Sequence, residues 1–155
     1  MAYELALRLE ARGIVPEHLL VSAHEAPRRA ERMTLHRADD ETLITRVRHL
    51  GDLHSDPELR DLLLPALRAD YRLIEGYQPP HPTPVRAPIT AYVGQDDPSC
   101  LLDHVLAWSE LAAPGRFELR SFPGDHFYLT PREAEVVADM AAGFARGSGT
   151  NHPWQ

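Results

Sequence analysis

Two short apolar segments separated by a helix-forming stretch constrain the fold of this chain more than any other feature. Residues 89–93 (ITAYV) and 117–122 (FELRSF) predict β-strands, and residues 101–113 carry apolar side chains at helical spacing. A strand–helix–strand order predicts a parallel βαβ unit, whose strands end at the same edge of the sheet. The sequence therefore predicts an α/β fold with about three parallel strands and flanking helices.

Each of the two predicted strands leads into a residue that can perform acid–base chemistry. The first is followed by Gly-Gln-Asp-Asp and the second by Pro-Gly-Asp-His, so Asp97 and His126 should face each other across neighbouring strand ends. A carboxylate beside an imidazole fixes the tautomer and stabilises the imidazolium. Because Gly-x-x-Asp-Pro is also a frequent turn signal, a structural role for Asp97 is the alternative. We predict that Asp97 and His126 are catalytic, with Asp96 as the second choice of carboxylate.

Asp125 is a poorer candidate for orienting His126, because adjacent residues in an extended loop point in opposite directions. A Ser-His-Asp site also needs a nucleophile, which α/β-hydrolases carry on a G-x-S-x-G turn ahead of the acid and the histidine. The sequence contains no such motif. Ser22 ends a predicted strand but has no flanking glycines. Cys100 follows Asp97 by only three residues, and lone cysteines usually pack in cores, so we expect it to be structural.

Composition excludes several classes of function. The net charge is −7, with sixteen arginines and no lysine, which argues against nucleic acid or an anionic membrane as partner. A single cysteine excludes an internal disulfide and suits a reducing cytoplasm. No segment approaches the roughly 20 apolar residues of a membrane helix. No two of the nine histidines stand at the i, i+4 spacing of a zinc site, so no metal is expected.

The rest of the chain predicts helices around this unit, with one more short strand at 18–23. Helices are expected at 2–12, from a cap at Asp39, from a capping box at Ser55 to about Tyr77, and from a capping box at Thr130 to Gly147. Pro65 is expected to divide the third of these. We predict one partial α/β domain over 1–147, with a helical cap insertion at about 38–78, a proline-rich linker at 79–88 and a disordered tail at 148–155.

Several motifs together resemble the type II thioesterases, which are α/β-hydrolases that accompany polyketide and non-ribosomal peptide synthetases. The resemblance covers nearly the whole chain up to about Arg146. It rests on VGQDDP at 93–98, FPGDHFYL at 122–129, DPELRDLLLPALRADY at 56–71, PITA at 88–91 and the segment around Trp108. Similar family members carry G-H-S-M-G immediately before the helix that begins here at Ala2. The resemblance therefore implies that the first half of the domain, with the serine, is absent, as a mis-assigned start codon or a truncated gene would produce. Asp125 departs from the glycine that the family often has.

The resemblance also implies a function. The family hydrolyses acyl thioesters from the phosphopantetheine arm of carrier proteins, without a metal or redox cofactor, and this chain alone would be inactive. Acidic carrier proteins could dock on Arg28, Arg29 and Arg32, although a solvated loop is the simpler interpretation. Four leucines of the cap, Leu59, Leu62, Leu63 and Leu67, are expected to pack together, with the lining of an acyl channel as the alternative. The alternatives are a non-catalytic remnant that binds carrier protein, and another α/β-hydrolase or acyltransferase.

Overall fold

The computed structural model describes residues 1–27, 34–47, 56–77, 79 and 81–148. The chain forms two compact units, one from Met1–Ala30 and His81–Gln155 and the other from Glu31–Pro80. Each unit is described by itself. Several predicted features lie outside the described residues: Arg28, Arg29 and Arg32, the cap residue Ser55, and the tail beyond Ser148.

The first unit is built on a parallel sheet of three strands, β1 (Leu19–Ser22), β2 (Ile89–Gly94) and β3 (Phe117–Phe122), in the order β1-β2-β3. β2 lies in the centre, paired in register with both neighbours, and every one of its residues is buried. A central parallel strand is covered on both faces, which explains its continuous apolar sequence. The predicted α/β class and the three parallel strands are confirmed.

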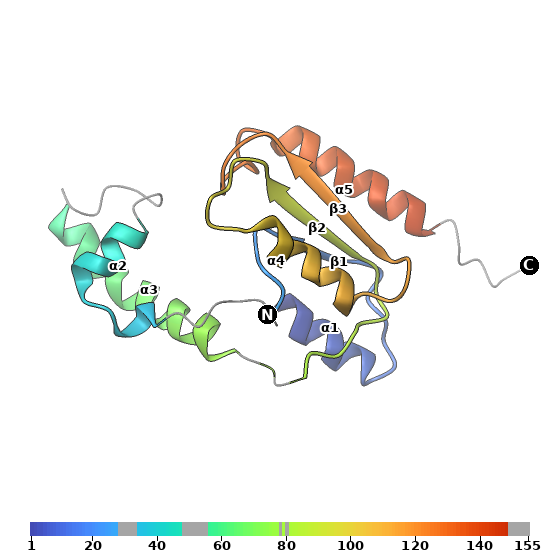
Figure 1. Ribbon diagram of the computed structural model, residues 1–155, viewed down its shortest axis with the longest axis horizontal. Coiled ribbons are helices and arrows are strands. Elements are labelled where there is room, and N and C mark those ends of the chain that lie inside the picture. Colours follow the sequence, from blue (N-terminus) through green and yellow to red (C-terminus); the bar gives the residue numbers. More distant parts are fainter. Residues whose placement is uncertain (28–33, 48–55, 78, 80, 149–155) are drawn as a thin grey trace, which may run out of the picture. The chain divides into compact units, whose positions relative to one another are not determined.

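Helices cover both faces of this sheet (Figure 1). α1 (Ala2–Glu10) and α4 (Leu102–Leu106), which continues as the 3₁₀ helix η3 (Ala107–Leu111), lie on one side, and α5 (Glu133–Ser148) lies on the other. Tyr3 of α1 packs edge-on against Trp108 of η3, with ring centroids 5.7 Å apart. On the opposite face, the Tyr92 hydroxyl donates a 2.9 Å hydrogen bond to Asp139 of α5. These contacts fix the layers on either side of β2.

Two boundaries in this unit differ from the sequence predictions. α5 begins at Glu133 and is not capped by Thr130, because residues 126–132 form turns in which the Thr130 and Arg132 N–H groups donate to Phe127 and Tyr128. The predicted helix at 101–113 is shorter and changes to 3₁₀ geometry at Ala107.

The proline-rich linker is anchored to the first unit, since Val85 is buried and bridges to Ala112.

The second unit consists of the 3₁₀ helix η1 (Leu35–Arg37), α2 (Asp40–Arg46) and α3 (Pro57–Gly76). As predicted, Asp39 caps α2 by accepting from the Thr42 N–H at 2.8 Å. The described cap of α3 is Asp56, which accepts from the Leu59 N–H at 2.9 Å. A carboxylate one residue later in the sequence can fill the same role, with Pro57 at the first helical position.

Pro65 does not divide α3, which runs unbroken through it. An internal proline removes one helical hydrogen bond and costs about 3 kcal/mol. The apolar face on both sides of Pro65 offsets this cost, because Leu63, Leu67 and Tyr71 pack with buried Leu64 against the α2 residues of the same core cluster. Burial therefore outweighs the local preference of proline.

No helix among the described residues is long and apolar enough to cross a membrane.

The outer edge of β1 predicts how the 155-residue polypeptide behaves by itself. Leu19 and Ala23 donate to Pro88 and Tyr92 on the β2 side. Backbone groups of alternate residues point to opposite sides, so Leu20 and Ser22 direct theirs to the other edge, where no described strand pairs. An unpaired strand edge is a template for association.

We therefore expect the isolated polypeptide to associate or to unfold without a sharp transition, despite its net charge of −7. Size-exclusion chromatography and a thermal melt check this expectation. A monomer with one sharp cooperative transition would show that the edge of β1 does not limit the stability of the chain.

Candidate active site

The loops that follow β2 and β3 are joined to each other through their backbones. The Gln95 N–H donates to Phe122 carbonyl oxygen and the Asp96 N–H to that of Gly124, both at 2.9 Å. Because the strands are parallel, both loops leave the same edge of the sheet. The hydrogen bonds hold them side by side beyond that edge.

Gly94 allows the two loops to approach this closely. A Cβ atom placed on Gly94 would lie 2.2 Å from Asp125 carbonyl oxygen and 2.6 Å from that of Gly124. Both contacts are to backbone, which cannot swing aside. Gly124 has a φ of +125°, a conformation that L-residues with side chains rarely adopt. Each loop therefore requires a glycine at the point where they meet.

This arrangement brings Asp97 and His126 together, as predicted. His126 Nδ1 lies 2.8 Å from Asp97 Oδ2. The Asp97 side chain is completely buried, whereas 39% of the His126 side chain is exposed. The pair thus joins a buried carboxylate to an imidazole that reaches the surface.

The buried Asp97 carboxylate is satisfied by three hydrogen-bond donors. Besides His126, the Ser99 N–H and the Ser99 hydroxyl donate to Asp97 Oδ1 at 2.9 and 2.6 Å. Burial acts to raise the pKa of Asp97, but the bonds from the Ser99 hydroxyl, from His126 and from the Ser99 N–H outweigh it, and the pKa lies below its ordinary value. Asp97 is therefore ionised at neutral pH.

The geometry suits proton transfer at the other ring nitrogen. An ionised carboxylate only accepts hydrogen bonds, so it favours a proton on His126 Nδ1. In that tautomer Nε2, on the opposite side of the ring, carries the lone pair of the neutral imidazole. When Nε2 takes a proton, the nearby carboxylate stabilises the resulting cation. The pair can act as a general base and then as a general acid.

The other two acidic candidates occupy different positions. Asp96 is exposed in the turn after β2. Asp125 accepts a 2.8 Å hydrogen bond from the Phe127 N–H and so shapes the turn that carries His126. Of the three carboxylates, the structure pairs Asp97 with the histidine.

Tyr128 anchors the loop that carries His126. Its ring is fully buried and stacks on Phe122 at a centroid distance of 5.9 Å, and Phe122 stacks on Tyr92 at 6.2 Å. The Tyr128 hydroxyl pairs with Ser22 Oγ at 2.8 Å, which links this loop to the end of β1. A buried aromatic residue two positions after His126 thus limits how far the imidazole can move.

Neither alternative nucleophile has the environment of a reactive group. Cys100 is buried, and burial, followed by the charges of Asp97 and Glu25, raises its pKa to about 11. A thiol with that pKa is almost entirely neutral at pH 7 and is a weak nucleophile. The hydroxyl of Ser22 is engaged by Tyr128. Within the described part of the chain, no three His, Cys, Asp or Glu side chains are placed to hold a metal ion.

Sequence reasoning did not single out Ser99. The hydroxyl lies in the turn after β2, within hydrogen-bond distance of both Asp97 and His126. A serine two residues after an aspartate is typical of a turn in which the carboxylate accepts from the backbone. That signal predicts the Ser99 N–H contact but not the contact of its hydroxyl with a histidine from another loop.

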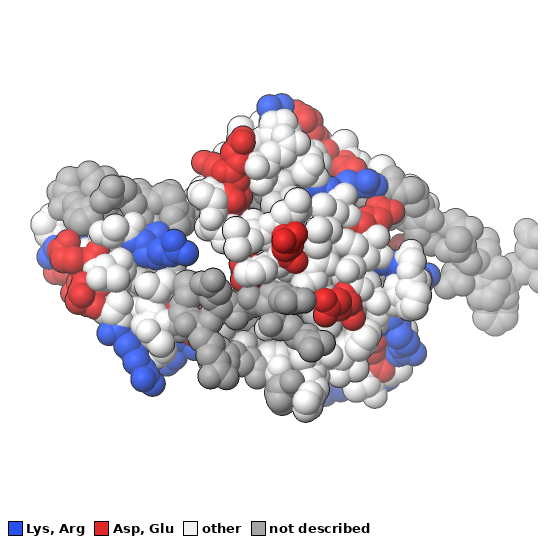
Figure 2. Space-filling view, viewed as in Figure 1, with Lys and Arg blue, Asp and Glu red and all other residues white. Residues whose placement is uncertain are grey.

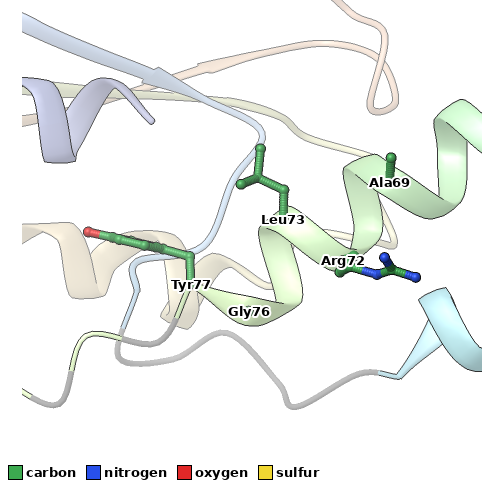
Figure 3. A pocket seen from close by; sticks show the side chains of 5 residues that line it. All are labelled: Ala69, Arg72, Leu73, Gly76 and Tyr77. Atoms are coloured by element: carbon green, nitrogen blue, oxygen red, sulfur yellow. The ribbon is translucent and has the colours of Figure 1, made fainter.

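The second unit carries an apolar groove of about 510 Å³ along the last turns of α3. Ala69, Arg72, Leu73, Gly76 and Tyr77 line it, and Ala69 and Leu73 point to the same side of the helix (Figure 3). Leu73 is 57% exposed. Of the four leucines predicted to pack in the cap, Leu63 and Leu67 do so, whereas Leu59 and Leu62 are exposed. A role of these four leucines in an acyl channel stays a prediction.

The surface of the first unit is mostly uncharged on the face that carries α4. Figure 2 shows separate acidic side chains there, with basic ones towards its margin. The chain as a whole is acidic, with 23 Asp and Glu against 16 Arg.

The loop after β1 is held against α4 and η3 by two contacts. The Trp108 indole N–H donates to the His24 carbonyl oxygen, and Glu25 pairs with His104 at 2.7 Å.

Comparison with known proteins identifies relatives of this chain. The family model described as thioesterase domain matches residues 1–143. Thioesterase PikA5 of Streptomyces venezuelae is 36% identical over 146 residues, which are 91% of this chain and 52% of that protein. The chain spans about half the length of the curated relatives it matches.

Solved structures show the same similarity. The type II thioesterase BorB from the borrelidin biosynthetic cluster superposes with a TM-score of 0.78 at 40% identity, covering 92% of this chain and 60% of that one. YbtT, a type II thioesterase from the yersiniabactin NRPS/PKS biosynthetic pathway, gives a TM-score of 0.80 at 27% identity, covering 94% and 61%.

Gly94→Ala tests how the site is assembled. Because the added methyl group would enter the space of two carbonyl oxygens, the loops must separate, and we expect a loss of about 2–4 kcal/mol in the free energy of unfolding. Chemical denaturation measures this loss. The matched control is Gly115→Ala, at a glycine whose Cβ would meet nothing within 4 Å but whose φ of +73° costs about 1 kcal/mol. Equal losses in the two variants would contradict the close-approach argument.

Proposed function

We propose that this chain, which belongs to the thioesterase domain family, provides the acid–base pair of a thioesterase that releases acyl groups from carrier proteins. The observation that carries the proposal is the 2.8 Å contact between His126 Nδ1 and the buried, ionised Asp97. The assigned roles are His126 as general base and acid, and Asp97 as the residue that orients it.

The proposed reaction has two steps and needs no redox cofactor. A serine hydroxyl attacks the thioester carbonyl while His126 Nε2 takes its proton; the C–S bond then breaks, and the thiolate leaves with the proton from Nε2. In the second step His126 takes a proton from water, which attacks the acyl-serine, and returns it to the serine oxygen. Throughout, Asp97 stays ionised and stabilises the imidazolium.

The serine in this proposal stands on a G-x-S-x-G turn, a motif that residues 1–155 do not contain. We propose that polypeptide outside these residues provides it, together with the backbone donors that stabilise the oxyanion. The raised pKa of Cys100 and the engagement of Ser22 by Tyr128 support this assignment over a nucleophile among the described residues.

The proposed substrate is an acyl group on the phosphopantetheine arm of an acyl or peptidyl carrier protein, removed as an editing step in polyketide or non-ribosomal peptide synthesis in the cytoplasm. Support comes from the 40% identity to BorB, a type II thioesterase from the borrelidin cluster, and from the likeness to YbtT of an NRPS/PKS pathway. A non-catalytic chain that binds carrier protein is the competing function, and the experiments below separate the two.

The polypeptide of residues 1–155 alone should release no thiol from an acyl-carrier substrate above the blank. The reason is that a general base without a nucleophile and an oxyanion site supplies little catalysis. A thiol-release assay with acyl-phosphopantetheinyl carrier protein measures it. Turnover that Cys100→Ala abolishes would refute this assignment in favour of a cysteine nucleophile.

A polypeptide that joins a G-H-S-x-G segment in frame to this chain should hydrolyse the same substrate. We expect His126→Ala to lower kcat by roughly 10³-fold or more and Asp97→Asn by a comparable factor, because an amide favours the wrong tautomer. Asp96→Asn is the matched control and should change kcat less than about three-fold, since its side chain is exposed.

Rates of acylation and of hydrolysis for these variants test the assigned carboxylate. Together with binding of acyl-carrier protein, they decide between the catalytic and the non-catalytic function. Greater damage at Asp96 than at Asp97 would show that the wrong carboxylate has been assigned. An inactive joined protein that still binds acyl-carrier protein would support the non-catalytic function.

A further inference from the structure

Ser99 lies between the two members of the pair. Its Oγ is 2.6 Å from Asp97 Oδ1 and 3.2 Å from His126 Nδ1, while Asp97 Oδ2 is 2.8 Å from the same nitrogen. Two oxygens, one from a carboxylate and one from a hydroxyl, therefore lie within hydrogen-bond distance of His126 Nδ1. The three groups form a closed triangle of contacts.

The protons of these three groups can be assigned from the number of hydrogen-bond donors and acceptors among them. A serine hydroxyl has one proton, and an ionised carboxylate can only accept. The short 2.6 Å bond to Asp97 Oδ1 therefore takes the proton of Ser99, as expected for a charge-assisted bond. Towards His126 the hydroxyl can present only a lone pair. Both of these oxygens then act as acceptors toward Nδ1, which favours the proton of the neutral ring on this nitrogen.

We infer that Ser99 is a positioning residue that, together with Asp97, holds His126 in the Nδ1–H tautomer. The inference rests on the proposed function, in which Nε2 must carry the lone pair that accepts the serine proton. Ser99 touches no reacting atom in that scheme. It acts by holding the Asp97 carboxylate in one orientation, through both its N–H and its hydroxyl, and by offering Nδ1–H a second acceptor.

Ser99 is well placed for a test, because it is exposed in its turn and a side-chain substitution leaves the backbone N–H that donates to Asp97 in place. Ser99→Ala removes the hydroxyl alone and Ser99→Thr keeps it. Ser109, an exposed serine of η3, offers a matched control, since Ser109→Ala removes a hydroxyl remote in sequence from both loops.

The ratio of the two tautomers of neutral His126 is the readout, measured by solid-state NMR on sedimented protein labelled with ¹⁵N-histidine. This measurement requires neither a monomer nor activity, and His126→Gln identifies the signals. We expect Ser99→Ala to lower the ratio of Nδ1–H to Nε2–H roughly five-fold, the effect of losing one hydrogen bond of about 1 kcal/mol. Ser99→Thr and Ser109→Ala should stay within about two-fold of the parent.

A change smaller than about two-fold in Ser99→Ala, or a failure of Ser99→Thr to preserve the ratio, would overturn the positioning role. The signals of the other eight histidines report whether a variant keeps its fold. Because no substrate is present, the result is independent of the proposed function. An altered tautomer ratio in a protein that proves inactive when joined to its nucleophile would contradict thioesterase chemistry and leave the role of Ser99 intact.

Discussion

The buried charge of Asp97 is the constraint on which the rest of the site depends. A carboxylate with no exposed surface is costly unless donors surround it. The turn after β2 supplies two of them from Ser99, and the third comes from His126 on a different loop. Satisfying the charge therefore requires two loops to meet, and the meeting fixes which histidine nitrogen faces the carboxylate. A requirement of folding and a requirement of proton transfer are met by the same contacts.

The sheet makes this meeting possible through features that carry no chemistry themselves. Parallel pairing brings the ends of β2 and β3 to one edge. Gly94 lets their loops approach to backbone contact, and Tyr128, buried beneath the loop after β3, keeps that loop from moving away. Burial of the Tyr128 ring stabilises the loop by an amount on the order of 2 kcal/mol. The partly exposed imidazole is thus held through two buried groups, the Asp97 carboxylate that it contacts and the Tyr128 ring that anchors its loop.

The elements that the sequence predicted best were those in which local pattern and burial agree. Residues 89–93 lie within the fully buried β2 and residues 117–122 form β3, both as predicted. Asp97 and His126 could be expected to lie close together because each follows a strand of the same parallel pair. Pro65 was misjudged because the packing of Leu64 and Leu67 with α2 outweighs a local preference. Thr130 has the sequence of a cap, but the turns that place His126 and Tyr128 delay the helix to Glu133. The contact of the Ser99 hydroxyl with His126 could not be predicted, because the histidine comes from another loop.

The ionisation of Asp97 is the most direct test of this account. Protein labelled with ¹³C at the aspartate carboxyl carbons can be titrated by NMR, with Asp97→Asn to identify the signal. Since the donors outweigh burial, we predict that the Asp97 carboxyl titrates below the ordinary value of about 3.9 while the protein is folded. The stability that the charge contributes should be present above the ordinary value and lost as the pH falls through the lowered one. A carboxyl group that titrates at or above the ordinary value would contradict the account, because burial would then prevail over its three hydrogen bonds.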